Sequence, residues 1–131
     1  MQTRRLSLVI SALALAAASF AANAGITFTN LGTAAPPATV GPYVMTAFDT
    51  TPQAAIDDFT SGIINIPGSP IPGTLGVNPG VQKFTVGDTW GSPWAHGYAG
   101  PIFYSNQQQI TLTLPANTHA FYFYTQGNYY G

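Results

Sequence analysis

Hydrophobic and hydroxyl-bearing side chains alternate with a period of two over several stretches of this chain, a pattern that is typical of β-strands. In Gln109–Leu114, the side chains of Ile110, Leu112 and Leu114 fall on one face, and the threonines between them fall on the other. Such stretches are rich in β-branched and aromatic residues, and Gly and Pro separate them. The same reasoning predicts three further strands, at Ile26–Asn30, Tyr43–Phe48 and Val81–Val86.

The residues that follow Leu114 predict a hairpin. Pro115–Thr118 has the composition of a four-residue turn. Beyond the turn, His119–Tyr124 carries aromatic side chains on both faces, which favours a central strand that is covered on each side. We therefore expect the stretches before and after the turn to pair antiparallel.

Two segments depart from the strand pattern. Four prolines and four glycines interrupt Asn65–Gly80, which predicts a surface loop. Thr51–Phe59 carries the one helical signal, because Thr51 is a suitable cap and Pro52 a suitable first residue for a single turn.

Short strands, long turns and the lack of alternating helices favour an all-β fold, either an antiparallel β-sandwich or a jelly roll. The chain ends at Gly131, soon after the aromatic stretch His119–Tyr124, and no later strand covers that stretch. We therefore expect the fold to be incomplete at its C-terminus.

The first residues have the pattern of an export signal. Two arginines precede an apolar run, Leu8–Ala18, and Ala22–Ala24 fits the small-x-small rule of signal peptidase. The apolar run is also shorter than a membrane span. We predict a signal peptide at 1–24 and a single exported domain at 25–131, located outside the cell or on its surface, with the periplasm as an alternative and without a membrane span in the mature chain.

Removing the predicted leader leaves one basic residue, Lys83, against four aspartates. One cation cannot displace enough counterions to bind nucleic acid, so that class of partner is excluded. Charged residues make up 5% of the chain, against about 25% in an average globular protein. Cysteine is absent, so disulfides cannot stabilise this exported domain.

The segment "WGSPWAHGYAGPIFYSN" and the later "ITLTLPANTHAFYFYTQGN" resemble exported bacterial proteins that carry a PEP-CTERM sorting tail. "AFDTTPQAAIDDFTSG" is similar to the opening of that group. The resemblance implies a secreted β-sandwich body of unknown biochemical function, sorted to the cell surface together with exopolysaccharide or other envelope components. The tail itself, with its Pro-Glu-Pro motif, is not in this chain, which contains no glutamate.

Catalytic residues are not predicted. A glycosidase needs two convergent carboxyl groups, and adjacent Asp57 and Asp58 would point to opposite faces of a strand. Ser92 has His96 nearby in the sequence but lacks the strained elbow of serine hydrolases. A hydrolase is therefore the third hypothesis for function.

Two binding sites remain as hypotheses. Asp57 and Asp58 offer the hard oxygen ligands that calcium prefers, with solvated loop residues as the alternative interpretation. Trp90, Trp94 and Tyr98, together with His96, could form an aromatic platform for sugar rings. The alternative is that these rings fix a loop to the core, with His96-Gly97-Tyr98 as a tight turn.

The sequence thus favours a secreted, non-enzymatic β-sandwich protein of the cell envelope or extracellular matrix that requires no cofactor. A carbohydrate-binding module is the second hypothesis.

Overall fold

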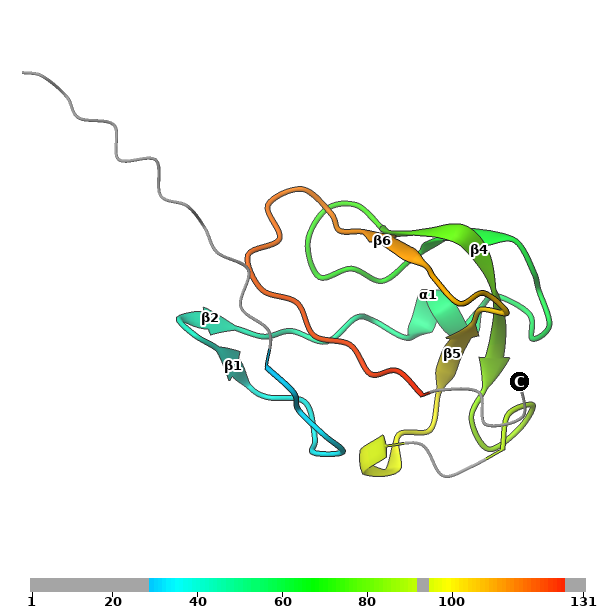
Figure 1. Ribbon diagram of the computed structural model, residues 1–131, viewed down its shortest axis with the longest axis horizontal. Coiled ribbons are helices and arrows are strands. Elements are labelled where there is room, and N and C mark those ends of the chain that lie inside the picture. The colour runs from blue at the N-terminus through cyan, green and yellow to red at the C-terminus, as the bar shows by residue number, and fades with distance from the viewer. Residues whose placement is uncertain (1–28, 92–94, 127–131) are drawn as a thin grey trace, which may run out of the picture. The chain divides into compact units, whose positions relative to one another are not determined.

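The computed structural model describes residues 29–91 and 95–126 of the chain. Its regular elements are mostly strands in two antiparallel sheets, of two and four strands, with one short helix and no closed barrel (Figure 1). All of them belong to the compact unit that begins at Leu31. The elements are β1 (Thr39–Val40), β2 (Tyr43–Val44), α1 (Thr51–Ala54), β3 (Ile63–Ile66), β4 (Leu75–Thr85), β5 (Pro101–Tyr104) and β6 (Thr111–Thr113), with a short 3-10 turn at Ala95–Gly97. For the described residues, the prediction of a mostly-β fold with antiparallel pairing is confirmed.

Strand β4 is the centre of the larger sheet. Its first residues pair with β3 on one edge and with β6 on the other. Further along, β5 replaces β6, so that Asn78 faces Thr111 of β6 and Gln82 faces Tyr104 of β5. The predicted strand Val81–Val86 is confirmed as the second half of β4, apart from Val86, which makes an isolated bridge.

The predicted loop Asn65–Gly80 is wrong at both ends, because Asn65 and Ile66 belong to β3 and β4 begins at Leu75. Proline interrupts a strand by removing a donor from the ladder, but Pro79 lies between the residues that pair with β6 and those that pair with β5. The register with β3 also shifts in this region. No ladder bond is therefore required from the residue at position 79.

The predicted hairpin is also wrong in its second half. The turn is present, since Thr118 donates both its N–H and its hydroxyl to the Pro115 carbonyl. However, β6 pairs with β4, and His119–Tyr124 belongs to no ladder. This segment contacts the N-terminal part of the unit through side chains: the His119 ring stacks on Tyr43 at 5.3 Å, and the Tyr124 hydroxyl donates to the Ala34 carbonyl.

The remaining predictions of secondary structure are met in part. Residues 26–28 lie outside the described residues, and Thr29 and Asn30 are not in a strand. Of Tyr43–Phe48, only the first two residues form β2. The single helical turn is confirmed with Pro52 at its start, but the N-cap is Thr50, and Asp49 Oδ1 accepts a bond from the Thr51 N–H.

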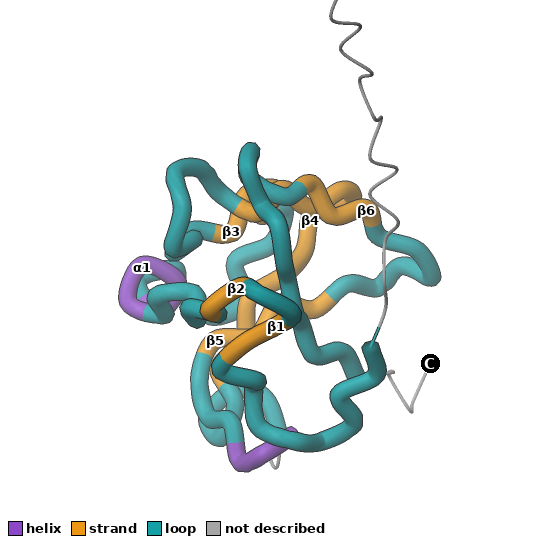
Figure 2. Tube along the Cα trace, turned by 90° about the vertical axis from the view of Figure 1, so that its left-hand side faces the viewer, coloured by secondary structure: helices purple, strands orange, loops and turns teal. Residues whose placement is uncertain are grey.

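The hydrophobic core is small and lies on one face of the larger sheet. Its buried centre is Ile66, Val77 and Val81, at 7%, 5% and 3% exposure. Partly buried side chains surround this centre, namely Ile63, Leu75, Phe103 and Leu112. Residues from all four strands therefore meet at β4, as the strands around it in Figure 2 indicate.

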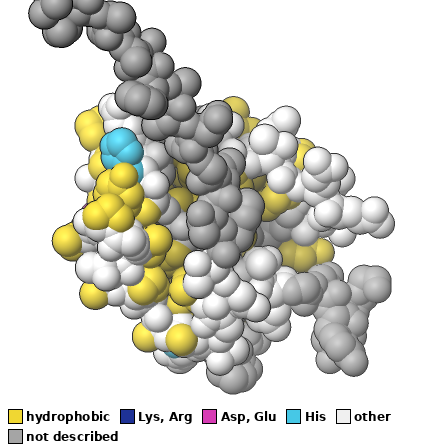
Figure 3. Space-filling model, turned by 60° about the vertical axis from the view of Figure 1, so that its left-hand side comes forward, with side chains coloured by type: hydrophobic (Ala, Val, Ile, Leu, Met, Phe, Trp, Pro, Cys, Tyr) yellow, Lys and Arg dark blue, Asp and Glu magenta, His cyan; other side chains and the backbone are white. Residues whose placement is uncertain are grey.

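Among the described residues, no helix has the length and apolar character needed to cross a bilayer. One face of the molecule displays hydrophobic, histidine and neutral polar side chains, and no acidic or basic colour appears on it (Figure 3).

Candidate functional site

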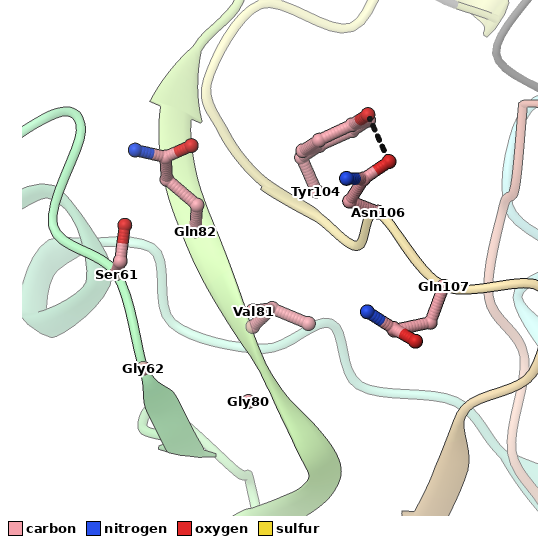
Figure 4. A pocket seen from close by; sticks show the side chains of 8 residues that line it. All are labelled: Ser61, Gly62, Gly80, Val81, Gln82, Tyr104, Asn106 and Gln107. Carbon is pink, nitrogen blue, oxygen red and sulfur yellow. Dashed lines mark hydrogen bonds between the residues drawn. The ribbon is translucent and has the colours of Figure 1, made fainter. Parts of the chain in front are cut away.

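A shallow pocket of about 200 Å³ crosses the middle of β4, at the point where the strand changes its edge partner. Figure 4 shows side chains from both edges around it, with Gly80 and Val81 of β4 between them. The lining consists of Ser61, Gly62, Gly80, Val81, Gln82, Tyr104, Asn106 and Gln107.

Gly80 and Gly62 lie close together in the lining of the pocket. Because Gly80 has no side chain, the backbone at Gly62 can come near β4 here. A Cβ at this position would come within 2.9 Å of the Gly62 carbonyl carbon. Strand β4 and the backbone at Gly62 can therefore come this close only because position 80 is a glycine.

The polar groups around the pocket are neutral. The Gln82 amide donates to the Phe59 carbonyl at 2.8 Å, which fixes its orientation. On the opposite side, the Tyr104 hydroxyl lies 3.5 Å from Asn106 Oδ1, and the Gln107 side chain extends toward β4 (Figure 4). Amide and hydroxyl groups donate and accept hydrogen bonds without charge, which suits a ligand rich in hydroxyl groups.

An aromatic cluster adjoins the pocket through Tyr104. Phe84 lies at its centre, with ring centroids 5.3 Å from Phe59, 5.2 Å from Trp90 and 6.1 Å from Tyr104. The Trp90 and Tyr104 rings are 5.5 Å apart. These edge-to-face and tilted contacts hold the Tyr104 ring at the rim of the pocket.

The residues of the predicted aromatic platform occupy different surroundings. Trp90 packs into the cluster around Phe84, and Trp94 lies outside the described residues. His96 is exposed and contacts the rings of Tyr98 and Tyr124. The Tyr98 hydroxyl donates to the Pro101 carbonyl, and burial raises the pKa of this hydroxyl. The structure thus packs the Trp90 ring against Phe84 and Tyr104, and it places His96 and Tyr98 at a tight turn, where His96 has a φ of 47°.

A second polar group lies on the opposite face of β4. Lys83 is 4% exposed and forms an ion pair with Asp58, whose side chain is 15% exposed. The Lys83 ammonium also donates to Thr85 Oγ1, and that hydroxyl lies 2.9 Å from Asp58 Oδ1. The Thr89 hydroxyl donates to Asp58 Oδ2 and accepts from the Thr85 N–H. Every polar atom named here has a partner, which a buried charge requires.

These contacts affect the titration of Asp58. The hydrogen bond from Lys83, followed by that from Thr89, lowers the pKa of Asp58 from 3.8 to about 2. Because the folded state favours the carboxylate, the ion pair stabilises the fold above about pH 4, and this contribution is lost as the pH falls toward 2. The hydrogen bond from the Thr51 N–H also lowers the pKa of Asp49. This bond therefore adds to the loss of stability at low pH.

In the ion-paired protein, we therefore expect the melting temperature to fall between pH 4 and pH 2. An Asp58→Asn variant should melt at a lower temperature at pH 6 and show a flatter profile in that range. Thermal unfolding of freshly refolded protein measures both. Asp57→Asn is the matched control, because the neighbouring Asp57 side chain is exposed; an equal effect of the two variants would contradict the assignment.

The two aspartates of the calcium hypothesis thus have different environments. Asp58 accepts bonds from Lys83, Thr85 and Thr89, whereas Asp57 is exposed. In the part of the chain that the structure describes, no three His, Cys, Asp or Glu side chains gather into a group that could hold a metal ion.

The pocket and the Lys83–Asp58 pair are not predicted from the sequence. The sequence does carry a signal for the pair. Lys83 is two residues from Val81 and from Thr85, so in a strand it shares a face with an apolar residue. The sequence carries no signal for the pocket, because the lining comes from three segments that only the strand pairing brings together. No family model, curated protein or solved structure matches this chain.

Proposed function

We propose that the chain is an exported, non-enzymatic protein of the cell envelope or extracellular matrix, and that the pocket across β4 binds a neutral glycan. Its body is a β-sandwich in this proposal, of the kind that the resemblance to PEP-CTERM proteins implies. The observation that carries the proposal is the neutral lining: hydroxyl and amide groups beside the Tyr104 ring, with no charged side chain among the lining residues.

The chemistry of sugars matches this arrangement. Sugar rings present apolar faces that pack on aromatic rings, and hydroxyl groups that exchange hydrogen bonds with amides. The lining offers both kinds of partner, from Tyr104 on one side and from Gln82, Asn106 and Gln107 around it. The export signal would bring such a site into contact with extracellular polysaccharide.

Binding should be detectable through Trp90, whose ring lies 5.5 Å from that of Tyr104. The chain has two tryptophans, so a Trp94→Phe variant leaves Trp90 as the single indole reporter. We expect a saturable change in its emission with a neutral polysaccharide from a panel of glucans, mannans and galactans. The affinity should change little with salt, because no charge lines the pocket. If acidic polysaccharides alone bind, and salt abolishes their binding, the proposal is wrong.

Variants at the rim locate the site. Asn106→Ala and Gln107→Ala should each weaken binding about three- to tenfold, the usual range for one hydrogen bond. Gln109→Ala is the matched control, because it lies in the same exposed segment but does not line the pocket. Titration calorimetry with the polysaccharide that binds best measures the difference; equal losses in all three variants would place the site elsewhere.

A further inference from the structure

Lys83 and Asp58 meet under unusual conditions for charged residues. Lysine is almost never fully buried unless it is paired, and Lys83 is the one lysine of the chain. Its ammonium contacts the Asp58 carboxylate directly. The two residues are 25 positions apart in the sequence, so the fold, and not chain proximity, brings them together.

The backbone holds the two side chains in register. The Phe59 N–H donates to the Lys83 carbonyl at 2.8 Å, and the Lys83 N–H donates to the Thr60 carbonyl at 3.0 Å. Phe59, which follows Asp58 in the chain, is therefore hydrogen-bonded to Lys83, whose side chain contacts Asp58. Such fixed geometry removes most of the entropic barrier to a reaction between two groups.

Apolar side chains flank Lys83 in the sheet. Phe103 of β5 lies directly opposite Lys83 in the register, and Val81, two residues earlier on the same strand face, is in the core. The pair rests as ammonium and carboxylate, and its reactive form arises when one proton passes along their hydrogen bond from Lys83 Nζ to Asp58, which gives a neutral amine and a neutral acid. A neutral amine is the nucleophilic form of lysine.

We propose that Lys83 and Asp58 form an intramolecular isopeptide bond after folding. The Lys83 Nζ attacks Asp58 Cγ, the Nζ–Cγ bond forms, and the Cγ–Oδ1 bond breaks. Two of the three ammonium protons leave with Oδ1 as one water molecule, and the third stays on the amide nitrogen. The Thr89 hydroxyl, which donates to Oδ2, stabilises the negative charge that develops there and then the amide oxygen.

The bond would replace what disulfides provide in other exported domains. The chain has no cysteine, and its buried core is small. A link from Asp58 to Lys83 would join the segment after α1 to the central strand β4. The proposal is independent of glycan binding, since the pair lies on the face of β4 away from Gln82. The acid sensitivity expected above belongs to the ion-paired form that precedes the bond.

Intact mass and tryptic digestion test the proposal together. The purified protein is held folded at neutral pH, denatured, and weighed by mass spectrometry. We expect a mass about 18 Da below that calculated for the residues present in the purified protein, with or without the predicted leader, because one water is released. Trypsin cleaves after Arg4, Arg5 and Lys83 in this chain. An acylated Lys83 resists cleavage, so the denatured protein should remain uncut between residues 83 and 84.

Lys83→Arg is the matched control, because it keeps the positive charge and the trypsin site but forms no such amide. Its mass should equal that of its sequence, and trypsin should cut it at position 83. The proposal is overturned if the unaltered protein has its full sequence mass. It is overturned equally if the mass is low but trypsin still cuts after Lys83, which would indicate a dehydrated aspartate without a cross-link.

Discussion

Gly68→Ala is expected to lower the free energy of unfolding by about 3 kcal/mol or more, because two costs coincide at this position. Gly68 has a φ of +93°, a conformation that L-residues rarely adopt. A Cβ there would also come within 2.1 Å of the Asp49 carbonyl oxygen. In the native fold, the Asp49 N–H donates to the Gly68 carbonyl at 2.8 Å and so joins the segment before α1 to the loop after β3. The clash would push these two segments apart.

Gly87→Ala separates the two costs. Gly87 has a similar φ of +86°, but an added Cβ there meets no atom within 4 Å. It should therefore cost only the conformational part, about 1–2 kcal/mol. Urea denaturation followed by tryptophan emission measures both variants; equal losses would show that the close approach of Asp49 to Gly68 is not part of the fold.

Ile66→Ala is expected to have the second large effect, a loss of about 2–4 kcal/mol. Ile66 is 7% exposed and packs with Val77 and Val81 in the core. Removing three carbon atoms from its side chain leaves a cavity that this small core cannot fill elsewhere. The same strand supplies the control: Ile64 is 59% exposed, so Ile64→Ala should change stability by no more than about 0.5 kcal/mol.

Urea denaturation of both isoleucine variants gives the comparison directly. A large loss for Ile64→Ala, or a small one for Ile66→Ala, would mean that β3 presents its other face to the core. The register in which Ile66 lies opposite Leu75 of β4 would then be wrong.

Local patterns predicted those parts of the fold that depend on local geometry. The alternation in Val81–Val86 reflects one buried and one less buried face, and most of it lies in β4. The turn at Pro115–Thr118 and the helical turn at Pro52 follow from backbone preferences of single residues. These features require no knowledge of distant partners.

Patterns failed where pairing between distant segments decides the outcome. Alternation in His119–Tyr124 indicates an extended backbone, but it does not say whether the segment joins a ladder, and here side chains make the contacts. Proline is typical of a strand break, yet Pro79 falls at the place where β4 exchanges β6 for β5. The pocket lies at the same exchange, so the residues of the proposed glycan site come from segments that no local pattern connects.

The most direct test of the central claim is to observe the pocket amides while a neutral polysaccharide binds. In a ¹⁵N-labelled sample, the side-chain NH₂ groups of Gln82, Asn106 and Gln107 give separate signals. The account predicts that these signals shift in a saturable way while those of Gln108 and Gln109 do not. Shifts confined to the control glutamines, or no shift with any polysaccharide of the panel, would contradict it.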